Sequence, residues 1–340
     1  MFRYPPSQTH VQQAQPFKVV IVGCDEALSS SITGALDMFA LAGVAWQRIH
    51  KQSIQPVFKT FLASQLGQPI TCINQVQLLP HLALEDVNYA DIVMLPTIGG
   101  DIQKVLEQTR GLLPHLIRLH KNGCDLVSNC TGAFLLANAG LLDNRTATTH
   151  WGYADQFQSQ FPKVNLQTQQ LITEDKGIFC AGGGMAWFDL VLRLIERYCD
   201  HQTAVNTAKA HVVDFVRGQQ AAYAPLQRRK FHHDQDILTL QDWLESHYSQ
   251  PIGINDMAES INMSSRSLIR RFKRATHQTP QQYLQTLRID HAKRLLISSD
   301  LSIIEVVQNV GYEDISSFTR LFKRITGFSP GHYRKSFRGR

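Results

Sequence analysis

Short hydrophobic runs alternate with stretches of helical periodicity over the first two hundred residues. The runs lie at residues 19–22, 91–95, 125–128 and 177–179, and the helical patterns lie at residues 32–41, 112–121, 133–139 and 187–198. Strands that alternate with helices are typical of a parallel sheet covered by helices on both faces. We therefore predict a doubly wound α/β domain over residues 17–200.

The hydrophobic pattern changes after about residue 235, from where every predicted element is helical. We predict an all-α domain over residues 236–340. The segment 201–235 begins as a helix-prone stretch and ends in the polar, basic residues 227–233, so we interpret it as a helical linker. Residues 1–16 are polar and rich in glutamine, and we interpret them as a flexible N-terminal tail.

The all-α domain contains an internal repeat at an offset of fifty residues. Residues 264–274 align with residues 314–324, and each segment has the pattern of a short helix with one apolar face. The apolar positions are Leu268, Phe272, Phe318 and Phe322. The same offset places a capping hydroxyl followed by proline at Thr279 and at Ser329. A cap and a helix that repeat together indicate a duplicated unit.

Each repeat begins with another short helix and a tight turn. Residues 254–261 lead to Asn262, and residues 303–310 lead to Gly311. Asparagine and glycine tolerate the left-handed conformation that such a corner needs. Residues 302–305 form a capping-box pattern at the start of the second of these helices. The sequence thus predicts two helix-turn-helix units.

The second helix of each unit carries side chains suited to the major groove of DNA. Arginine binds guanine with two hydrogen bonds, so we predict that Arg266, Arg270 and Arg320 read bases. The predicted contacts beside them are Ser265, Ile269, Ile315, Ser316 and Thr319. Cations at the ends of the two helices are predicted to meet phosphates, and these are Lys273, Arg274, Lys323 and Arg324. As an alternative, the cations are ordinary solvated charges.

Charge is distributed unevenly between the two parts of the chain. Residues 228–340 contain 18 Lys and Arg against 11 Asp and Glu, whereas the remainder contains 16 against 17. A basic domain beside a neutral one favours a polyanionic partner, although a solvated basic face would have the same composition.

The repeat resembles the DNA-binding domain of the AraC/XylS family over residues 237–338. The similar residues lie in segments 264–272, 283–296, 311–323 and 327–334. The resemblance implies two units joined by a long helix over residues 280–298, which would place both recognition helices on one side of double-stranded DNA. It further implies a sequence-specific regulator, usually an activator, that works as a homodimer and contacts RNA polymerase.

Cys130 follows a predicted strand and precedes a predicted helix. A thiol at a helix N-terminus is favoured as thiolate, and Gly132 permits a sharp turn there. His150 lies twenty residues further along the chain. A cysteine with a distant histidine is weak evidence of catalysis, because buried cysteines mostly serve packing.

Residues 17–198 resemble the ThiJ/PfpI, class I glutamine-amidotransferase-like superfamily. The similar segments are 130–133, 139–142, 147–151 and 181–190. The resemblance implies a flavodoxin-like fold in which Cys130 would be the nucleophile, His150 its base, and Gly99 and Gly100 backbone donors that face a pocket. Ser31 stands where the family has an acidic residue, and Thr131 stands where protease-like members have a histidine.

These departures remove two groups that would activate the cysteine. We therefore predict no enzymatic activity and a pocket for a small metabolite, lined by Cys130, Thr131, His150, Gly99, Gly100 and Ser31. The fusion resembles the GlxA-type subgroup of AraC regulators, which implies a nitrogen-containing effector. Two alternatives remain open: a cysteine-dependent amidase or hydrolase, and a redox sensor that uses oxidation of Cys130.

The remaining composition favours a cytoplasmic protein. No apolar run approaches the length of a membrane span, and no export signal precedes residue 17. The six cysteines lack the pairwise spacing of a zinc site or a disulfide framework. We expect reduced thiols, no metal site and no cofactor.

Overall fold

The computed structural model describes residues 15–213, 234–276 and 278–338, which belong to two compact units. Each unit is described by itself. The predicted tail lies almost wholly outside the described residues, as do positions 214–233 of the predicted linker with their basic stretch 227–233. Within the described residues, no helix combines the length and the apolar character that crossing a membrane requires.

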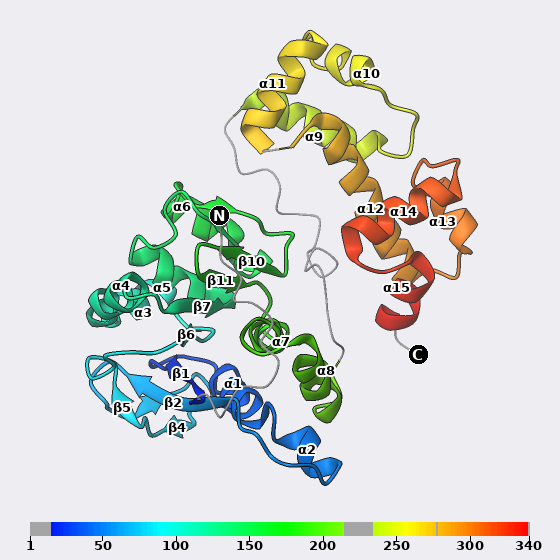
Figure 1. Cartoon of the computed structure of the whole chain (residues 1–340). Helices are drawn as coiled ribbons and strands as arrows, with labels where there is room; N and C mark the ends of the chain where they lie inside the picture. The colour runs from blue at the N-terminus through cyan, green and yellow to red at the C-terminus, as the bar shows by residue number, and fades with distance from the viewer. Residues whose placement is uncertain (1–14, 214–233, 277, 339–340) are drawn as a thin grey trace. The chain divides into compact units, whose positions relative to one another are not determined.

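The first unit is built on a seven-stranded sheet of order β10-β11-β7-β6-β1-β2-β5 (Figure 1). Its strands are β1 (Phe17–Val22), β2 (Phe58–Ser64), β5 (Leu82–Ala83), β6 (Ile92–Leu95), β7 (Asp125–Asn129), β10 (Ile172–Asp175) and β11 (Ile178–Ala181). Two small sheets pair β3 (Ile70–Thr71) with β4 (Gln77–Leu78) and β8 (Thr146–Ala147) with β9 (Asn165–Leu166). The four predicted strands are present as β1, β6, β7 and β11.

The sheet departs from the predicted parallel arrangement at one edge. β10 pairs antiparallel with β11, whereas the other pairings within the sheet are parallel. Only Lys176 and Gly177 separate these two strands, and so short a connection forces them to run in opposite directions. β2 was not predicted, because only its last three residues form a continuous buried run.

Helices cover both faces of this sheet. They are α1 (Ser29–Leu41), α2 (Ala45–Ile49), α3 (Ile102–Gln108), α4 (Leu113–Lys121), α5 (Ala133–Asn138), α6 (Ala154–Gln160), α7 (Trp187–Tyr198) and α8 (His201–Ala210), with 3-10 turns η1 (Arg110–Leu112), η2 (Cys130–Gly132) and η3 (Trp151–Tyr153). The helical patterns predicted from the sequence correspond to α1, α4, α5 and α7. The doubly wound α/β prediction is confirmed.

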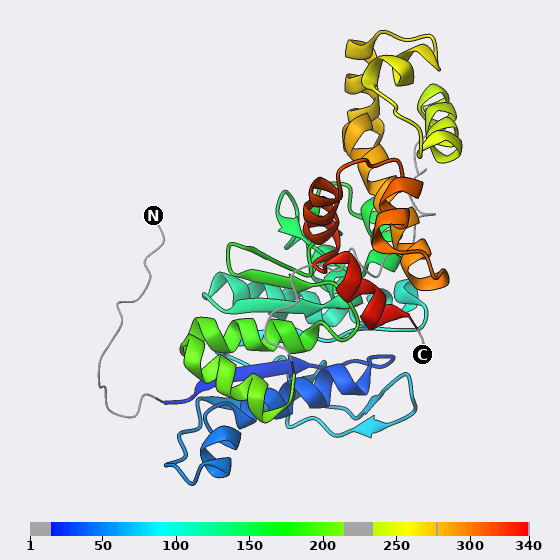
Figure 2. The same cartoon turned by 90° about the vertical axis from the view of Figure 1, so that its right-hand side faces the viewer.

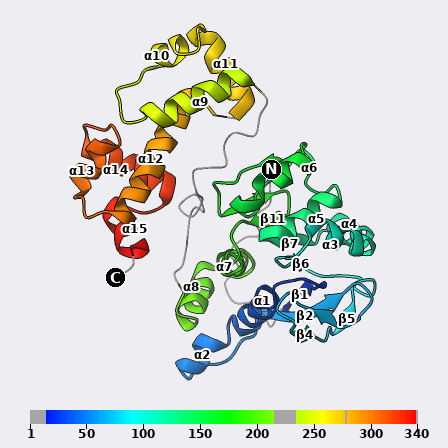
Figure 3. The same cartoon turned by 180° about the vertical axis from the view of Figure 1, so that it is seen from behind.

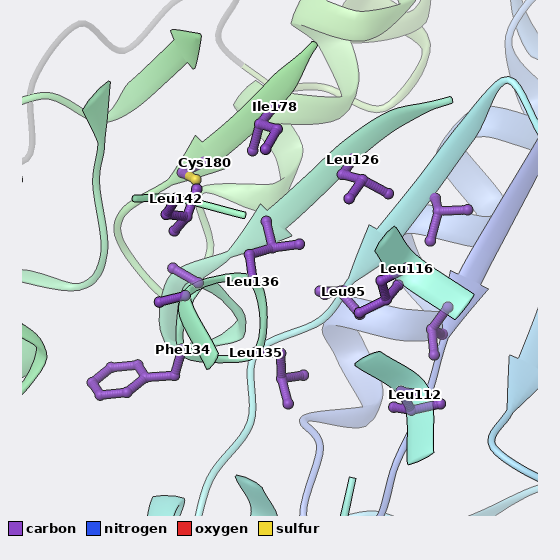
Figure 4. Packing of buried hydrophobic residues seen from close by; sticks show 14 of the residues in the cluster. Leu95, Leu112, Leu116, Leu126, Phe134, Leu135, Leu136, Leu142, Ile178 and Cys180 are labelled. Atoms are coloured by element: carbon purple, nitrogen blue, oxygen red, sulfur yellow. The ribbon is translucent and has the colours of Figure 1, made fainter. Parts of the chain in front are cut away.

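Alternate residues of each strand enter two different hydrophobic clusters. In β1, Val20 and Val22 pack with α3, α4 and α5, whereas Val19 and Ile21 pack with α1 and α7. Figure 4 shows part of the first cluster, to which Leu116 and Phe134 belong although they come from different helices. This alternation explains why the strands of a sheet covered on both faces are apolar throughout.

The helix α8 extends the first unit beyond the predicted boundary at residue 200. Ala204 and Ala208 are buried in the same cluster as α1 and α7. This helix was predicted as part of the linker, but its apolar face joins it to the packed unit.

The second unit is entirely helical in its described residues. Its helices are α9 (Gln235–His247), α10 (Ile254–Glu259), α11 (Ser265–Thr276), α12 (Pro280–Ser298), α13 (Ile303–Asn309), α14 (Ile315–Thr326) and α15 (Pro330–Phe337). The long helix α12 runs from the end where α9, α10 and α11 gather to the end where α13, α14 and α15 gather (Figures 2 and 3). Each end has its own hydrophobic cluster.

The duplicated unit predicted from the sequence is present. α11 and α14 each contain 12 residues and begin fifty positions apart, and α12 and α15 both begin at a proline that follows a capping hydroxyl. The corners are left-handed, with φ of 52° at Asn262 and 79° at Gly311. The capping box at Ser302 is also formed.

Candidate functional site

Buried aromatic residues fix the outward face of α11 and α14. Phe272 in α11 and Phe318 and Phe322 in α14 have no exposed surface. Because these side chains point into the clusters, the opposite face of each helix is turned to solvent. Asp314 caps α14 by accepting hydrogen bonds from the Ser316 and Ser317 N–H groups.

The predicted DNA contacts lie on these outward faces. Ten of the twelve are exposed, and the other two, Ser265 and Thr319, are half-buried. Exposed apolar side chains occur among them, since Ile269 is 42% exposed and Ile315 is 38% exposed. Such side chains suit contact with the thymine methyl group in the major groove.

Several cations on these faces have no partner within the described part of the chain. Arg266, Arg270 and Lys273 make neither a hydrogen bond nor an ion pair with a described residue, and Arg320 contacts only Ser317 of its own helix (3.3 Å). An unpaired arginine keeps all five N–H donors for a ligand.

Arg271 differs from its neighbour Arg270. Its guanidinium binds both carboxylate oxygens of Asp234, the N-cap of α9, and lies 2.8 Å from Asp236. These carboxylates raise the pKa of Arg271, and the ion pairs connect α11 with the start of α9. Arg270 has no such partner among the described residues.

The first unit contains a strained corner at Cys130, between β7 and η2. Cys130 has φ of 56°, which non-glycine residues rarely adopt. Position 132 requires glycine, because a side chain there would come within 2.4 Å of the Pro96 carbonyl oxygen. The corner lies at the carboxyl ends of β6 and β7, beside the point where strand order reverses around β1, which is the usual ligand position in open α/β sheets.

Burial is the main influence on the thiol at this corner. Burial raises the pKa of Cys130, while hydrogen bonds from Thr131 and Thr97 lower it less strongly. The predicted preference for thiolate is therefore wrong, because desolvation outweighs the donors that the short turn η2 supplies.

Three of the predicted pocket residues use their polar groups within the protein. The Ser31 hydroxyl donates to the Leu28 carbonyl (2.8 Å) and accepts from the Thr97 N–H (3.2 Å). Thr131 accepts from the Ile98 N–H (3.0 Å) and donates to the carbonyl of the same residue. The Gly99 N–H donates to the Glu26 carbonyl. Gly99 therefore offers no free backbone donor, whereas Gly100 is exposed.

His150 is connected to the corner through its neighbour, because the Thr149 hydroxyl donates to the Cys130 carbonyl (2.8 Å). The Nδ1 atom of His150 accepts a hydrogen bond from the Gly152 N–H (2.9 Å). A neutral imidazole whose Nδ1 accepts must carry its proton on Nε2. In that tautomer Nε2 carries the proton and does not act as a base.

Two buried polar residues near the corner were missed by the sequence analysis. Asn129 donates to Thr97 Oγ1 (2.7 Å) and to the Gly184 carbonyl (3.0 Å), but its buried Oδ1 has no partner among the described residues. The indole N–H of Trp187 is also buried without one. Asparagine before the corner cysteine was the available signal, since a polar residue at the end of a buried strand needs a partner.

A separate cavity of about 150 Å³ opens at the carboxyl ends of β1 and β2. Its lining includes Cys24, Asp25, Gln65 and Gln108. None of the six predicted pocket residues lines this cavity.

Two family models match the chain. The DJ-1/PfpI family matches residues 17–197, and a helix-turn-helix domain matches residues 257–336. The chain is similar to the HTH-type transcriptional regulator CdhR of Pseudomonas aeruginosa, with 30% identity over 280 residues that cover 82% of each protein. GbdR of the same species is 26% identical over 87% of this chain and 81% of its own length. GlxA of Rhizobium meliloti is 29% identical over 65% of this chain and 68% of its own length.

Solved structures share the fold of the first unit. A THiJ/PfpI family protein from Pseudomonas syringae has a TM-score of 0.51 at 16% identity and covers 64% of this chain and 83% of its own. Drosophila melanogaster DJ-1beta has a TM-score of 0.50 at 17% identity and covers 59% and 100%.

Proposed function

This chain belongs to the DJ-1/PfpI family and carries an AraC-type helix-turn-helix domain, and we propose that it regulates transcription by binding a specific DNA sequence under the control of a small metabolite. The observation that carries the proposal is the pair of 12-residue helices, α11 and α14, which repeat at fifty residues and expose unpaired cations. The relatives CdhR, GbdR and GlxA are all named transcriptional regulators.

DNA recognition divides between the two kinds of cation on these helices. Arg266, Arg270 and Arg320 lie on the outward faces, where a bidentate grip on guanine would give sequence preference. Lys273 and Lys323 lie in the last turns of α11 and α14, where contact with phosphate would add affinity without preference.

The metabolite site is proposed beside Cys130 and His150, at the carboxyl ends of β6 and β7. Asn129 Oδ1 is a buried acceptor without a partner among the described residues, and an N–H group of a ligand would satisfy it. This acceptor favours the nitrogen-containing class of metabolite. Ser31, Thr131 and Gly99 would then shape the site through the bonds they make within the protein.

The domain would bind its ligand without turning it over. Ser31 supplies no carboxylate, burial raises the pKa of Cys130, and the acceptor nitrogen of His150 is already occupied. These three features argue against a cysteine hydrolase and against a thiolate-based redox sensor. We further propose a cytoplasmic homodimer that activates transcription through contact with RNA polymerase.

The DNA assignment is tested with the full-length protein. Genomic fragments that it retains are sequenced, and the affinity for the enriched site is then measured by fluorescence anisotropy. Arg270→Ala or Arg320→Ala should weaken specific binding by about 1–3 kcal/mol and leave binding to random DNA nearly unchanged. Lys104→Ala, which removes an exposed cation from α3 of the other unit, serves as the control. Equal losses on both kinds of DNA would contradict base reading, and the absence of any enriched site would overturn the regulator assignment.

A further inference from the structure

The two helix-turn-helix units are joined by more than the long helix α12. The C-terminal end of α9, which packs with the first helix-turn-helix unit, reaches the corner of the second helix-turn-helix unit. The side chain of Arg288 lies between them. We call the residues that meet here the Arg288 clamp: Arg288, His291, Gly311, Tyr312 and the segment 248–250.

Arg288 holds the end of α9 by two charge-assisted hydrogen bonds. Its Nε donates to the Tyr248 carbonyl (2.7 Å) and its second terminal nitrogen donates to the Gln250 carbonyl (2.7 Å). Tyr248 is the C-cap of α9, and the free carbonyls at a helix end attract a cation. One planar guanidinium thus binds the carbonyl of the helix C-cap and a second carbonyl two residues beyond it.

The same guanidinium faces the second helix-turn-helix unit. Its central carbon lies 5.2 Å from the centre of the Tyr312 ring, which packs edge-on against Phe318 of the recognition helix α14 (5.3 Å). A chain of direct contacts therefore runs from the end of α9 through Arg288 to α14.

Two further contacts close the clamp around Arg288. One turn along α12, the His291 ring stacks on Tyr248 with ring centres 3.7 Å apart. Tyr248 packs against the hydrophobic clusters of both helix-turn-helix units. A side chain at Gly311 would come within 2.5 Å of the Ser249 carbonyl oxygen. The corner of the second helix-turn-helix unit therefore lies directly on the segment 248–250 that Arg288 binds.

We propose that the Arg288 clamp fixes the second helix-turn-helix unit relative to the first and thereby sets the spacing of the two DNA segments that the protein accepts. This inference rests on the proposed function. Residues of α12 are buried in the hydrophobic cluster at each end of the helix, and the clamp adds a direct connection between the two helix-turn-helix units beside it. Binding both DNA segments with one rigid protein then requires one particular separation of those segments.

Arg288→Lys is the first test, because lysine keeps the charge but lacks the planar fork that reaches two carbonyls. The matched control is Arg334→Lys. Arg334 likewise donates to two backbone carbonyls, those of Leu296 and Leu301, but these bonds lie within the second helix-turn-helix unit. Both full-length variants are compared with the unchanged protein on the enriched site, on duplexes with one or two base pairs added or removed between the two segments, and on duplexes with one segment scrambled.

Arg288→Lys should lose about tenfold in affinity for the intact site, while its binding to either single segment changes less than about twofold. Its preference for the natural spacing should fall toward equality with the altered spacings. Arg334→Lys should keep that preference. If Arg288→Lys keeps the preference, or loses affinity equally on intact and scrambled sites, the clamp does not set the spacing.

A second pair of variants tests the clamp without touching Arg288. Asparagine tolerates positive φ, so Gly311→Asn mainly introduces a clash with Ser249, whereas Gly327→Asn, at φ of 82°, meets open space. Only Gly311→Asn should relax the spacing preference. If the unchanged protein enriches no two-segment site, the proposed function and the clamp both fail; if it does and neither Gly311→Asn nor Arg288→Lys relaxes the spacing, the clamp alone fails.

Discussion

Among single residues, Cys130 combines a left-handed backbone with a buried thiol. Its φ of 56° presents the residue at the end of β7, as a catalytic corner would, but burial raises the pKa of the thiol. Activation also needs a charge or a base, and the position that would supply a carboxylate holds Ser31, whose hydroxyl bonds to the backbone of Leu28 and Thr97.

Replacing Cys130 with serine should leave metabolite-dependent transcription intact, because burial raises the pKa of the thiol and the Nδ1 atom of His150 already accepts a hydrogen bond. A promoter-reporter assay measures this directly. Alkylation of Cys130, followed by mass spectrometry of the modified peptide, should reach half its maximal rate only above the ordinary pKa of a cysteine, since burial raises that pKa. Loss of the response in Cys130→Ser, or rapid alkylation at neutral pH, would restore the hydrolase and redox alternatives.

At the scale of elements, the duplication extends to individual hydrogen bonds. Thr276 and Thr326 end the two recognition helices in the same way: each hydroxyl donates to the carbonyl of the phenylalanine four residues earlier. The next helix of each repeat begins with a hydroxyl cap, at Thr279 and at Ser329. Local capping thus fixes where each recognition helix stops and where the following helix starts.

Removing the cap of α12 should loosen its first turn. In Thr279→Ala the Gln282 N–H loses its acceptor (3.2 Å), which should cost about 1 kcal/mol. Hydrogen exchange, followed by mass spectrometry of peptides from the start of α12, should show faster exchange there. Thr286→Ala makes the same chemical change inside the helix, where alanine is favourable, and should leave these rates unchanged. Equal rates in all three proteins would show that the cap does not limit the helix end.

At the scale of the whole molecule, the described chain contains two independent sets of hydrophobic clusters. Those of the first unit involve residues up to Val213, and those of the second begin at Ile237. Units with separate cores unfold as separate cooperative transitions unless they share a large interface.

Calorimetry of the full-length protein should therefore show two transitions with different ligand responses. Screening amino acids, betaines and polyamines should reveal a class that raises the transition temperature of the first unit alone. A ligand of that class at 100 times its Kd should add about 2.7 kcal/mol to the free energy of unfolding of that unit. The enriched DNA site should raise only the other. Random DNA of equal length is the control, and a metabolite that shifts the second transition alone would contradict a sensor role for the α/β unit.

Local sequence pattern was enough to predict four strands and four helices of the first unit, the helices of the fifty-residue repeat and the outward faces of α11 and α14. These features depend on periodicity, caps and turn residues, whose physical effects act within about a dozen residues of chain. The capping hydroxyl and proline at Thr279 and Ser329, and the left-handed corners at Asn262 and Gly311, needed no distant partner to be predicted.

Only the tertiary structure decided which polar groups are free and which are already used. Arg270 and Arg271 are adjacent and chemically identical, yet only Arg271 pairs with the carboxylate of Asp234, which lies 37 positions away. The carbonyls that Arg288 holds lie 38 and 40 positions from it, and the pKa of Cys130 depends on burial by several elements. Desolvation and long-range pairing are properties of the packed chain, because they arise from neighbours that sequence distance does not reveal.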